Sequence, residues 1–150
     1  MSQDGVDLGK SLGYLLKEAS SALRVAMEEV LRPLGMSVTH YSCLELLAQR
    51  PGLSNSELAR GAFVTRQSMN VLLQTLEREG DVTRPAEAPV GKVLPTRLTP
   101  RGRRKLEKAT VAVRSVEVRM LGGLTETEQS GAFRILQSMI HSLRDGDDGA

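Results

Sequence analysis

The chain has 150 residues, of which 40% are apolar and 25% are charged, and its formal net charge is +2. This length suits one folded domain, or one binding module with additional helices. Aromatic residues make up only 3% of the chain, so the core must consist mainly of Leu, Val, Met and Ala side chains. Such a core favours a mainly helical protein over a sheet sandwich.

The same composition argues against several classes of protein. The sequence has neither a long apolar run nor a charged-then-apolar leader, which predicts a cytoplasmic protein without a membrane partner. A single cysteine, Cys43, excludes an intrachain disulfide, and with only two histidines we expect no metal and no cofactor.

Two helices are predicted first. Apolar residues recur at helical spacing from about residue 8 to residue 31, and Pro33 and Gly35 end this pattern. Ser37 is a suitable N-cap for a second helix, which Pro51 and Gly52 would end.

A helix-turn-helix is predicted over residues 54–79. Ser54 followed three residues later by Glu57 forms a capping-box pattern for a short helix over residues 55–60. Thr65 is a good N-cap for a longer helix that ends before Gly80. Apolar residues on this second helix follow the helical period and predict one packed face: Met69, Leu72, Leu73 and Leu76.

The polar residues at the start of the second helix are the candidate DNA-reading residues. Arginine suits a guanine edge or a phosphate, and the amides of Gln67 and Asn70 suit adenine. We expect the following residues to contact DNA: Thr65, Arg66, Gln67, Ser68 and Asn70.

After Gly80 the pattern predicts a β-hairpin, with strands near residues 81–84 and 93–98. Pro95 cannot donate to a ladder, so the returning strand should be irregular or at an edge there. Thr99 as N-cap and Pro100 at the first helical position begin a fifth helix. Gly122 and Gly123 break it, and a sixth helix starts near Thr125; the tail from residue 144 is acidic and Gly-rich.

Basic charge is concentrated around the helix-turn-helix. Residues 60–108 hold eleven Lys or Arg and five acids, a local balance of +6, against −4 for the remainder. A solvated basic face would also show this excess of positive charge. The excess coincides with the helix-turn-helix, however, which favours phosphate binding. Candidate phosphate contacts, for which simple solvation is the alternative, are Ser54, Arg101, Arg103 and Arg104.

Four segments in the same order and spacing are similar to the multiple-antibiotic-resistance regulator (MarR) family: residues 52–59, 64–68, 76–80 and 98–102. The resemblance covers about residues 8–144. It implies a six-helix winged helix-turn-helix fold in an intertwined homodimer. Residues 8–34 and 100–144 would form the dimerisation helices, and residues 37–99 the DNA-binding lobe.

The resemblance also implies a function. It implies a transcription regulator, usually a repressor, that binds a pseudo-palindromic site in double-stranded DNA and is released by a small-molecule effector or by cysteine oxidation.

The chain departs from the family at two places. The turn before the reading helix holds Phe63 where the family usually has Gly, so we expect a differently shaped turn. The wing lacks the family's Asp-x-Arg motif, and Lys92 is the remaining cation at its tip. Lys92 is therefore the predicted wing contact, with Arg84 and Arg97 as flanking phosphate contacts.

Other residues have two readings. Cys43 is either a small buried hydrophobe or a redox sensor, and the first role is the commoner one. Tyr14, His40 and Tyr41 are candidates for an effector pocket, with capping or core packing as the alternative.

Two other functions compete with DNA binding. A winged helix can serve as a protein-interaction module without DNA readout, although polar Gln67 and Asn70 beside Arg66 argue against that. No catalytic motif is evident in the sequence, so we expect no enzyme activity.

Overall fold

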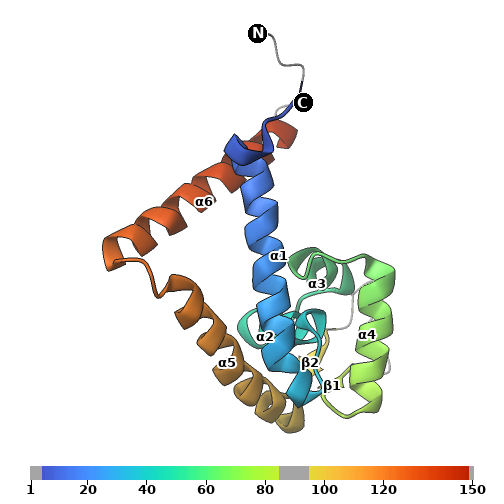
Figure 1. The fold of residues 1–150 in the computed structure, drawn as a ribbon. Coiled ribbons are helices and arrows are strands. Elements are labelled where there is room, and N and C mark those ends of the chain that lie inside the picture. The colour runs from blue at the N-terminus through green and yellow to red at the C-terminus, as the bar shows by residue number, and fades with distance from the viewer. Residues whose placement is uncertain (1–4, 85–94, 149–150) are drawn as a thin grey trace. The chain divides into compact units, whose positions relative to one another are not determined.

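The computed structural model describes residues 5–84 and 95–148 and divides into two compact units, Met1–Val116 and Glu117–Ala150 (Figure 1). The described part is mainly helical with one small antiparallel sheet, which confirms the predicted fold class. None of the helices in this part is long and apolar enough to cross a membrane.

The first unit contains the helix-turn-helix and the wing. Its elements in chain order are α1 (Leu12–Leu31), α2 (Val38–Gln49), α3 (Asn55–Gly61), α4 (Arg66–Arg78), β1 (Val82–Thr83), β2 (Arg97–Leu98) and the larger part of α5 (Pro100–Leu121). Short 3-10 turns at Leu8–Lys10 and Arg32–Leu34 flank α1.

The first helix is shorter than predicted. The sequence pattern starts it at residue 8, but Ser11 has extended backbone angles and caps α1, its side chain accepting the N–H of Tyr14. The residues before it form a separate turn, in which the Asp7 carboxylate accepts the N–H of Gly9. Two local side-chain caps therefore divide the predicted helix.

The predicted N-caps are confirmed. Ser37 accepts the N–H of His40, Ser54 forms the full capping box with Glu57, and Thr65 accepts the N–H of Ser68. Each cap satisfies a first-turn amide that lacks a partner within the helix. The caps read from the sequence therefore predict the first residue of α2, α3 and α4 correctly.

One apolar core joins these elements. Leu side chains from four helices and Val82 from β1 are fully or almost fully buried in it: Leu31, Leu44, Leu58, Leu73, Leu76 and Val82. Leu106 and Ala109 close the core from α5. The ends of α1 and α5 that pack here thus help to build the lobe that carries the helix-turn-helix.

Three helices of this unit end in the same hydrogen-bond pattern, in which the chain turns back through a left-handed residue. The 3-10 turn after α1 ends at Gly35 (φ 68°) and α4 ends at Gly80 (φ 81°). At the end of α3 this position is Phe63, with φ 60°; its N–H donates to the Arg60 carbonyl, and the Val64 N–H donates to the Ala59 carbonyl. The expectation of a differently shaped turn is wrong, because Phe63 adopts the glycine conformation itself.

The Phe63 turn should therefore be strained. A left-handed conformation costs a residue with a Cβ about 1 kcal/mol or more, and Phe63 recovers little by packing because its side chain is 85% exposed. We expect Phe63→Gly to raise the free energy of unfolding by about 1 kcal/mol. Urea titrations would measure this gain in the free energy of unfolding. Phe63→Ala, which keeps the Cβ, should show no such gain, and an equal gain in both variants would contradict the strain.

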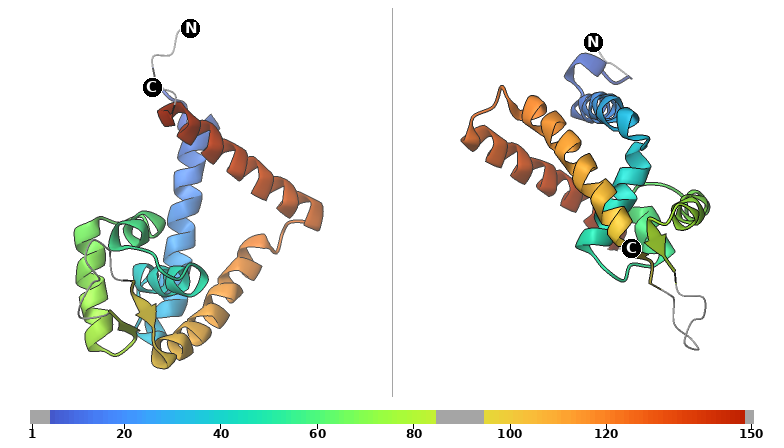
Figure 2. Two further views of the ribbon diagram at one scale, coloured as in Figure 1. Left: turned by 180° about the vertical axis from the view of Figure 1, so that it is seen from behind. Right: turned by 90° about the horizontal axis from the view of Figure 1, so that it is seen from below.

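The wing strands are short. Val82 pairs with Leu98 and Thr83 with Arg97, and Figure 2 shows β2 beside α2. The returning strand is shorter than the predicted 93–98, because Pro95 lacks an N–H and lies before β2. The loop of residues 85–94, which includes Lys92, lies outside the described residues.

The start of α5 is tied to the end of α4. Thr99 caps α5 by accepting the Gly102 N–H at 3.0 Å, and its hydroxyl donates to the Gly80 carbonyl at 2.6 Å. Its own N–H donates to the Asp81 carbonyl at 3.0 Å. Gly102 faces this same carbonyl, and a Cβ built on it would lie only 2.1 Å from the oxygen. The first turn of α5 therefore requires glycine at this place.

The second unit holds the end of α5 and α6 (Glu126–Asp148). Thr125 and Glu128 form a reciprocal cap at the start of α6, as the sequence predicts. The helix continues past residue 144, where we expected the tail to begin. The Nε2 atom of His141 lies 2.9 Å from a carboxylate oxygen of Asp145, one turn further along, and this contact supports the extension.

Candidate nucleic-acid interface

The two faces of α4 differ in burial as predicted. Met69, Leu73 and Leu76 are fully buried, and Leu72 is half-buried. The polar residues that we expected to contact DNA are all exposed: Thr65, Arg66, Gln67, Ser68 and Asn70. A rigid helix therefore presents a continuous polar surface to solvent.

Hydrogen bonds fix one edge of this surface to α3 and the wing. The Oδ1 of Asn70 accepts from Asn55 at the start of α3 and from Arg84 after β1, each at 3.4 Å. A second nitrogen of Arg84 lies 3.6 Å from a carboxylate oxygen of Glu77. Asn70 thus joins three elements, a role that the sequence pattern did not reveal.

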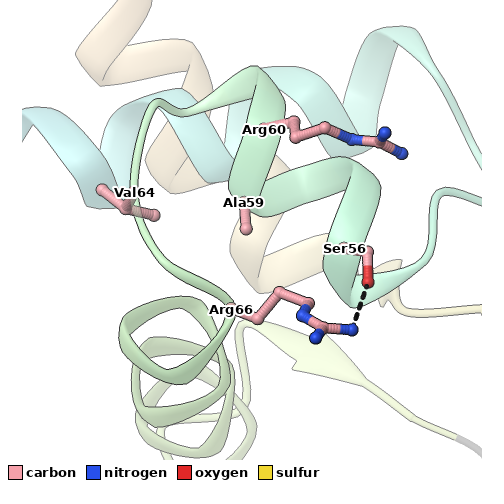
Figure 3. A pocket seen from close by; sticks show the side chains of 5 residues that line it. All are labelled: Ser56, Ala59, Arg60, Val64 and Arg66. Atoms are coloured by element: carbon pink, nitrogen blue, oxygen red, sulfur yellow. Dashed lines mark hydrogen bonds between the residues drawn. The ribbon is translucent and has the colours of Figure 1, made fainter.

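A small cavity lies between α3 and the first residue of α4 (Figure 3). It has a volume of about 370 Å³ and is lined by Ser56, Ala59, Arg60, Val64 and Arg66. Nη1 of Arg66 donates to the Ser56 hydroxyl at 3.5 Å. We call this cavity the α3–α4 notch. Only Ser54, the cap of α3, was predicted from the sequence as a contact from that helix, and Ser56 and Arg60 were therefore missed.

The flanking candidates differ in their surroundings. Arg84 is half-buried and already holds the contacts to Glu77 and Asn70, whereas Arg97 is exposed on β2. Ser54 uses its hydroxyl as the acceptor in the α3 cap.

The basic cluster at the start of α5 has an internal partner. Asp81 is fully buried, and its carboxylate lies 2.8 Å from Lys105 Nζ and 3.5 Å from Arg101 Nε. These contacts explain why Arg101 and Lys105 occur near a helix N-terminus, where the helix dipole opposes cations. Arg101 is therefore engaged within the chain, while Arg103 and Arg104 are exposed and have no ion pair among the described residues.

The three candidate effector residues are not brought together within one chain. Tyr41 packs against the core beside His40, but Tyr14 lies about 20 Å along α1 from Met27, where that helix joins the core. A separate cavity of about 290 Å³ at the α1–α2 junction is lined by other residues: Glu28, Arg32, Gly35, Met36 and Ser37.

His40 is half-buried, and its Nε2 atom has no hydrogen-bond partner among the described residues. Burial lowers its pKa from the usual 6.5, against the opposing effects of Asp81 and Glu79 and with a smaller lowering effect of Lys105. The folded state therefore favours neutral His40. As the pH falls below about 6.5, the unfolded chain takes up the proton first, and stability decreases.

This predicts a lower urea midpoint at pH 5.5 than at pH 7.5, and a smaller difference between the two midpoints in His40→Gln. His141 is exposed and present in both proteins, so it serves as the internal control. An equal pH dependence in the variant would contradict the prediction.

Cys43 is fully buried, and burial raises the pKa of its thiol to about 12. A thiol that stays protonated and out of solvent reacts slowly with oxidants. These features favour the core role for Cys43.

Comparison with known proteins decides the family. The family model described as MarR family matches residues 34–92. The chain is 43% identical over 128 residues to the HTH-type transcriptional repressor Rv2887 of Mycobacterium tuberculosis, covering 85% of this chain and 92% of the repressor. The chain belongs to the MarR family.

Solved structures agree with this assignment to the MarR family. A crystal structure of Rv2887 with salicylic acid has a TM-score of 0.73 and 41% identity, and covers 91% of this chain and 98% of that one. Rv2887 in complex with DNA gives a TM-score of 0.72 and 41% identity, with coverages of 86% and 97%. MarR-family membership confirms the predicted function class, a DNA-binding winged helix-turn-helix transcription regulator and not an enzyme.

Proposed function

We propose that this MarR-family regulator is a homodimeric repressor that binds a pseudo-palindromic site through α4. The observation that carries the proposal is the exposed polar face of α4, held by a buried apolar face and by caps on both helices of the motif. The 43% identity to a transcriptional repressor supports repression as the direction of regulation. A two-fold dimer would place its reading helices about one turn of DNA apart, roughly 34 Å.

Dimerisation explains apolar side chains that the chain alone leaves uncovered. In the amino-terminal half of α1 the exposed large residues include Leu12 (62%) and Leu15 (56%). On α6 they include Phe133 (66%) and Leu143 (79%). Soluble monomers rarely expose so many large apolar residues, so we assign these surfaces on residues 8–34 and 100–144 to a second copy of the chain.

The amino-terminal half of α1 gives a direct test of this assembly. Leu12→Glu/Leu15→Glu should shift the protein from dimer to monomer in light scattering at micromolar concentration. Val71→Glu, at a 57% exposed site on α4, is the matched control and should leave the dimer unchanged. A wild-type monomer would overturn the proposed assembly.

The effector is proposed to be a small aromatic carboxylate. The support is the structure of Rv2887 in complex with salicylic acid. Salicylate should release this protein from DNA in a titration, with benzyl alcohol as the uncharged control. Release by both compounds, or by neither, would contradict the proposed class of effector.

The central test is selection of DNA from a random library by purified full-length protein. The expected result is an enriched inverted repeat with a half-site spacing of about 10 base pairs. Binding to that DNA should weaken steeply with salt, because a dimer releases many counterions. Enrichment of no motif, together with a log–log salt slope near zero, would favour a protein-interaction module instead.

A further inference from the structure

The α3–α4 notch combines two cations that form no ion pair among the described residues. Arg60 and Arg66 are both exposed, and neither forms an ion pair within the described part of the chain. Glu57, an acid on the same helix, accepts the Ser54 N–H in the α3 cap, and its pKa is lowered mainly by its hydrogen bonds with Ser54 and less by the charge of Arg60. Two guanidinium groups lining one cavity repel each other, and an anion between them would remove that cost.

The composition of the notch suits an oxyanion. Ala59 and Val64 contribute apolar wall, while Ser56 adds a hydroxyl donor beside Arg66 (Figure 3). Guanidinium forks bind phosphate oxygens through paired, charge-assisted hydrogen bonds. Ser56, Arg60 and Arg66 therefore provide hydrogen-bond donors that line the α3–α4 notch.

Arg66 lies at the edge of α4 that faces α3. Its bond to Ser56, and the bond of Asn70 to Asn55 one turn later, hold this edge against the first turn of α3. Gln67 follows Arg66 by one residue and therefore points about 100° further round the helix. The geometry separates an anchoring edge, which holds Arg66, from a reading face, which holds Gln67.

We propose that Ser56, Arg60 and Arg66 form a seat for a single phosphate of the DNA backbone. In this role Arg66 fixes the position of α4 on the duplex and reads no base, and Arg60 is a DNA contact from outside the reading helix. The proposal rests on the proposed function and selects one of the two roles, guanine edge or phosphate, that the sequence allowed for Arg66.

The test compares Arg60→Gln, Arg66→Gln and the double variant with the wild type, on the selected DNA and on a scrambled duplex of equal length. Arg78→Gln is the matched control, since it removes the same charge from the exposed carboxyl end of α4. Affinities are measured at several salt concentrations, and melting temperatures check that each variant is folded.

Each single variant removes one phosphate contact from each half of the proposed homodimer, which reduces the log–log salt slope by about 1.8. The affinity defect of each single variant should therefore shrink about 12-fold between 50 and 200 mM salt. The defect should be equal on both duplexes, because a phosphate contact carries no sequence information. The double variant should lose less than the product of the single losses, as expected for two groups on one phosphate.

Three results would overturn the seat. One is a defect of Arg66→Gln confined to the selected duplex, with a guanine lost from its enriched motif. Another is an unchanged salt slope, and the third is multiplicative losses in the double variant. Failure of the wild type to bind any DNA would instead refute the proposed function, so the two failures are distinguishable.

Discussion

Gly102→Ala should destabilise the DNA-binding lobe severely. The added Cβ would lie 2.1 Å from the Asp81 carbonyl oxygen and 3.0 Å from its carbon, and both are backbone atoms that cannot rotate away. The first turn of α5 would have to move off the end of α4, breaking the Thr99 bonds to Gly80 and Asp81. We expect a loss of at least about 3 kcal/mol in the free energy of unfolding.

Urea denaturation at fixed protein concentration would measure this loss, because the stability of a dimer depends on concentration. Gly13→Ala is the control. Gly13 also lies in the first turn of a helix, but a Cβ there would meet only the Ser11 hydroxyl, at an ordinary 3.7 Å. That substitution should leave stability unchanged or raise it slightly. Equal effects at the two glycines would refute the steric argument.

Lys105→Met should cause the second largest loss in the free energy of unfolding. The substitution keeps much of the side-chain length but removes the cation 2.8 Å from the Asp81 carboxylate, which is fully buried. Arg101, at 3.5 Å, would be the remaining ion-pair partner among the described residues. A buried charge without its main partner costs about 3 kcal/mol or more.

A second substitution distinguishes charge from packing. Asp81→Asn in the Lys105→Met background removes the buried charge that has lost its main partner, and it should recover much of the lost stability. Lys108→Met, one turn further along α5 at an exposed position, is the matched control and should change stability by less than about 0.5 kcal/mol. If Asp81→Asn brings no recovery, the loss comes from packing of the Lys105 chain.

Much of the fold could be predicted from the sequence because its signals are local. Caps such as Ser54 with Glu57, and breaks such as Gly122 with Gly123, depend on residues only a few positions apart. The boundaries that differ have local causes too: Ser11 caps a helix that apolar periodicity extends to residue 8, and His141 with Asp145 prolongs the last one.

The candidate site was harder to predict from the sequence, because its organisation depends on contacts between residues that are far apart in the chain. The exposure of Gln67 follows from the helical period, but the partners of Asn70 are 15 and 14 residues away. Asp81 and Lys105 are 24 residues apart, and nothing in a linear pattern pairs them. The role of Phe63 was misjudged because glycine is a preference of the left-handed turn, and a stable surrounding structure can impose that conformation on another residue.

In the proposed complex with DNA, the bonds to Asn70 would limit the bases that this side chain can recognise. A side-chain amide recognises adenine by accepting from N6 and donating to N7 at once. Both lone pairs of the Asn70 oxygen already have donors, from Asn55 and Arg84, which leaves only the NH₂ group for an incoming partner. With α4 in the major groove, Asn70 would present hydrogen-bond donors alone. It could donate to O6 or N7 of guanine, to O4 of thymine or to N7 of adenine, and it would lose the paired contact that distinguishes adenine from the other bases.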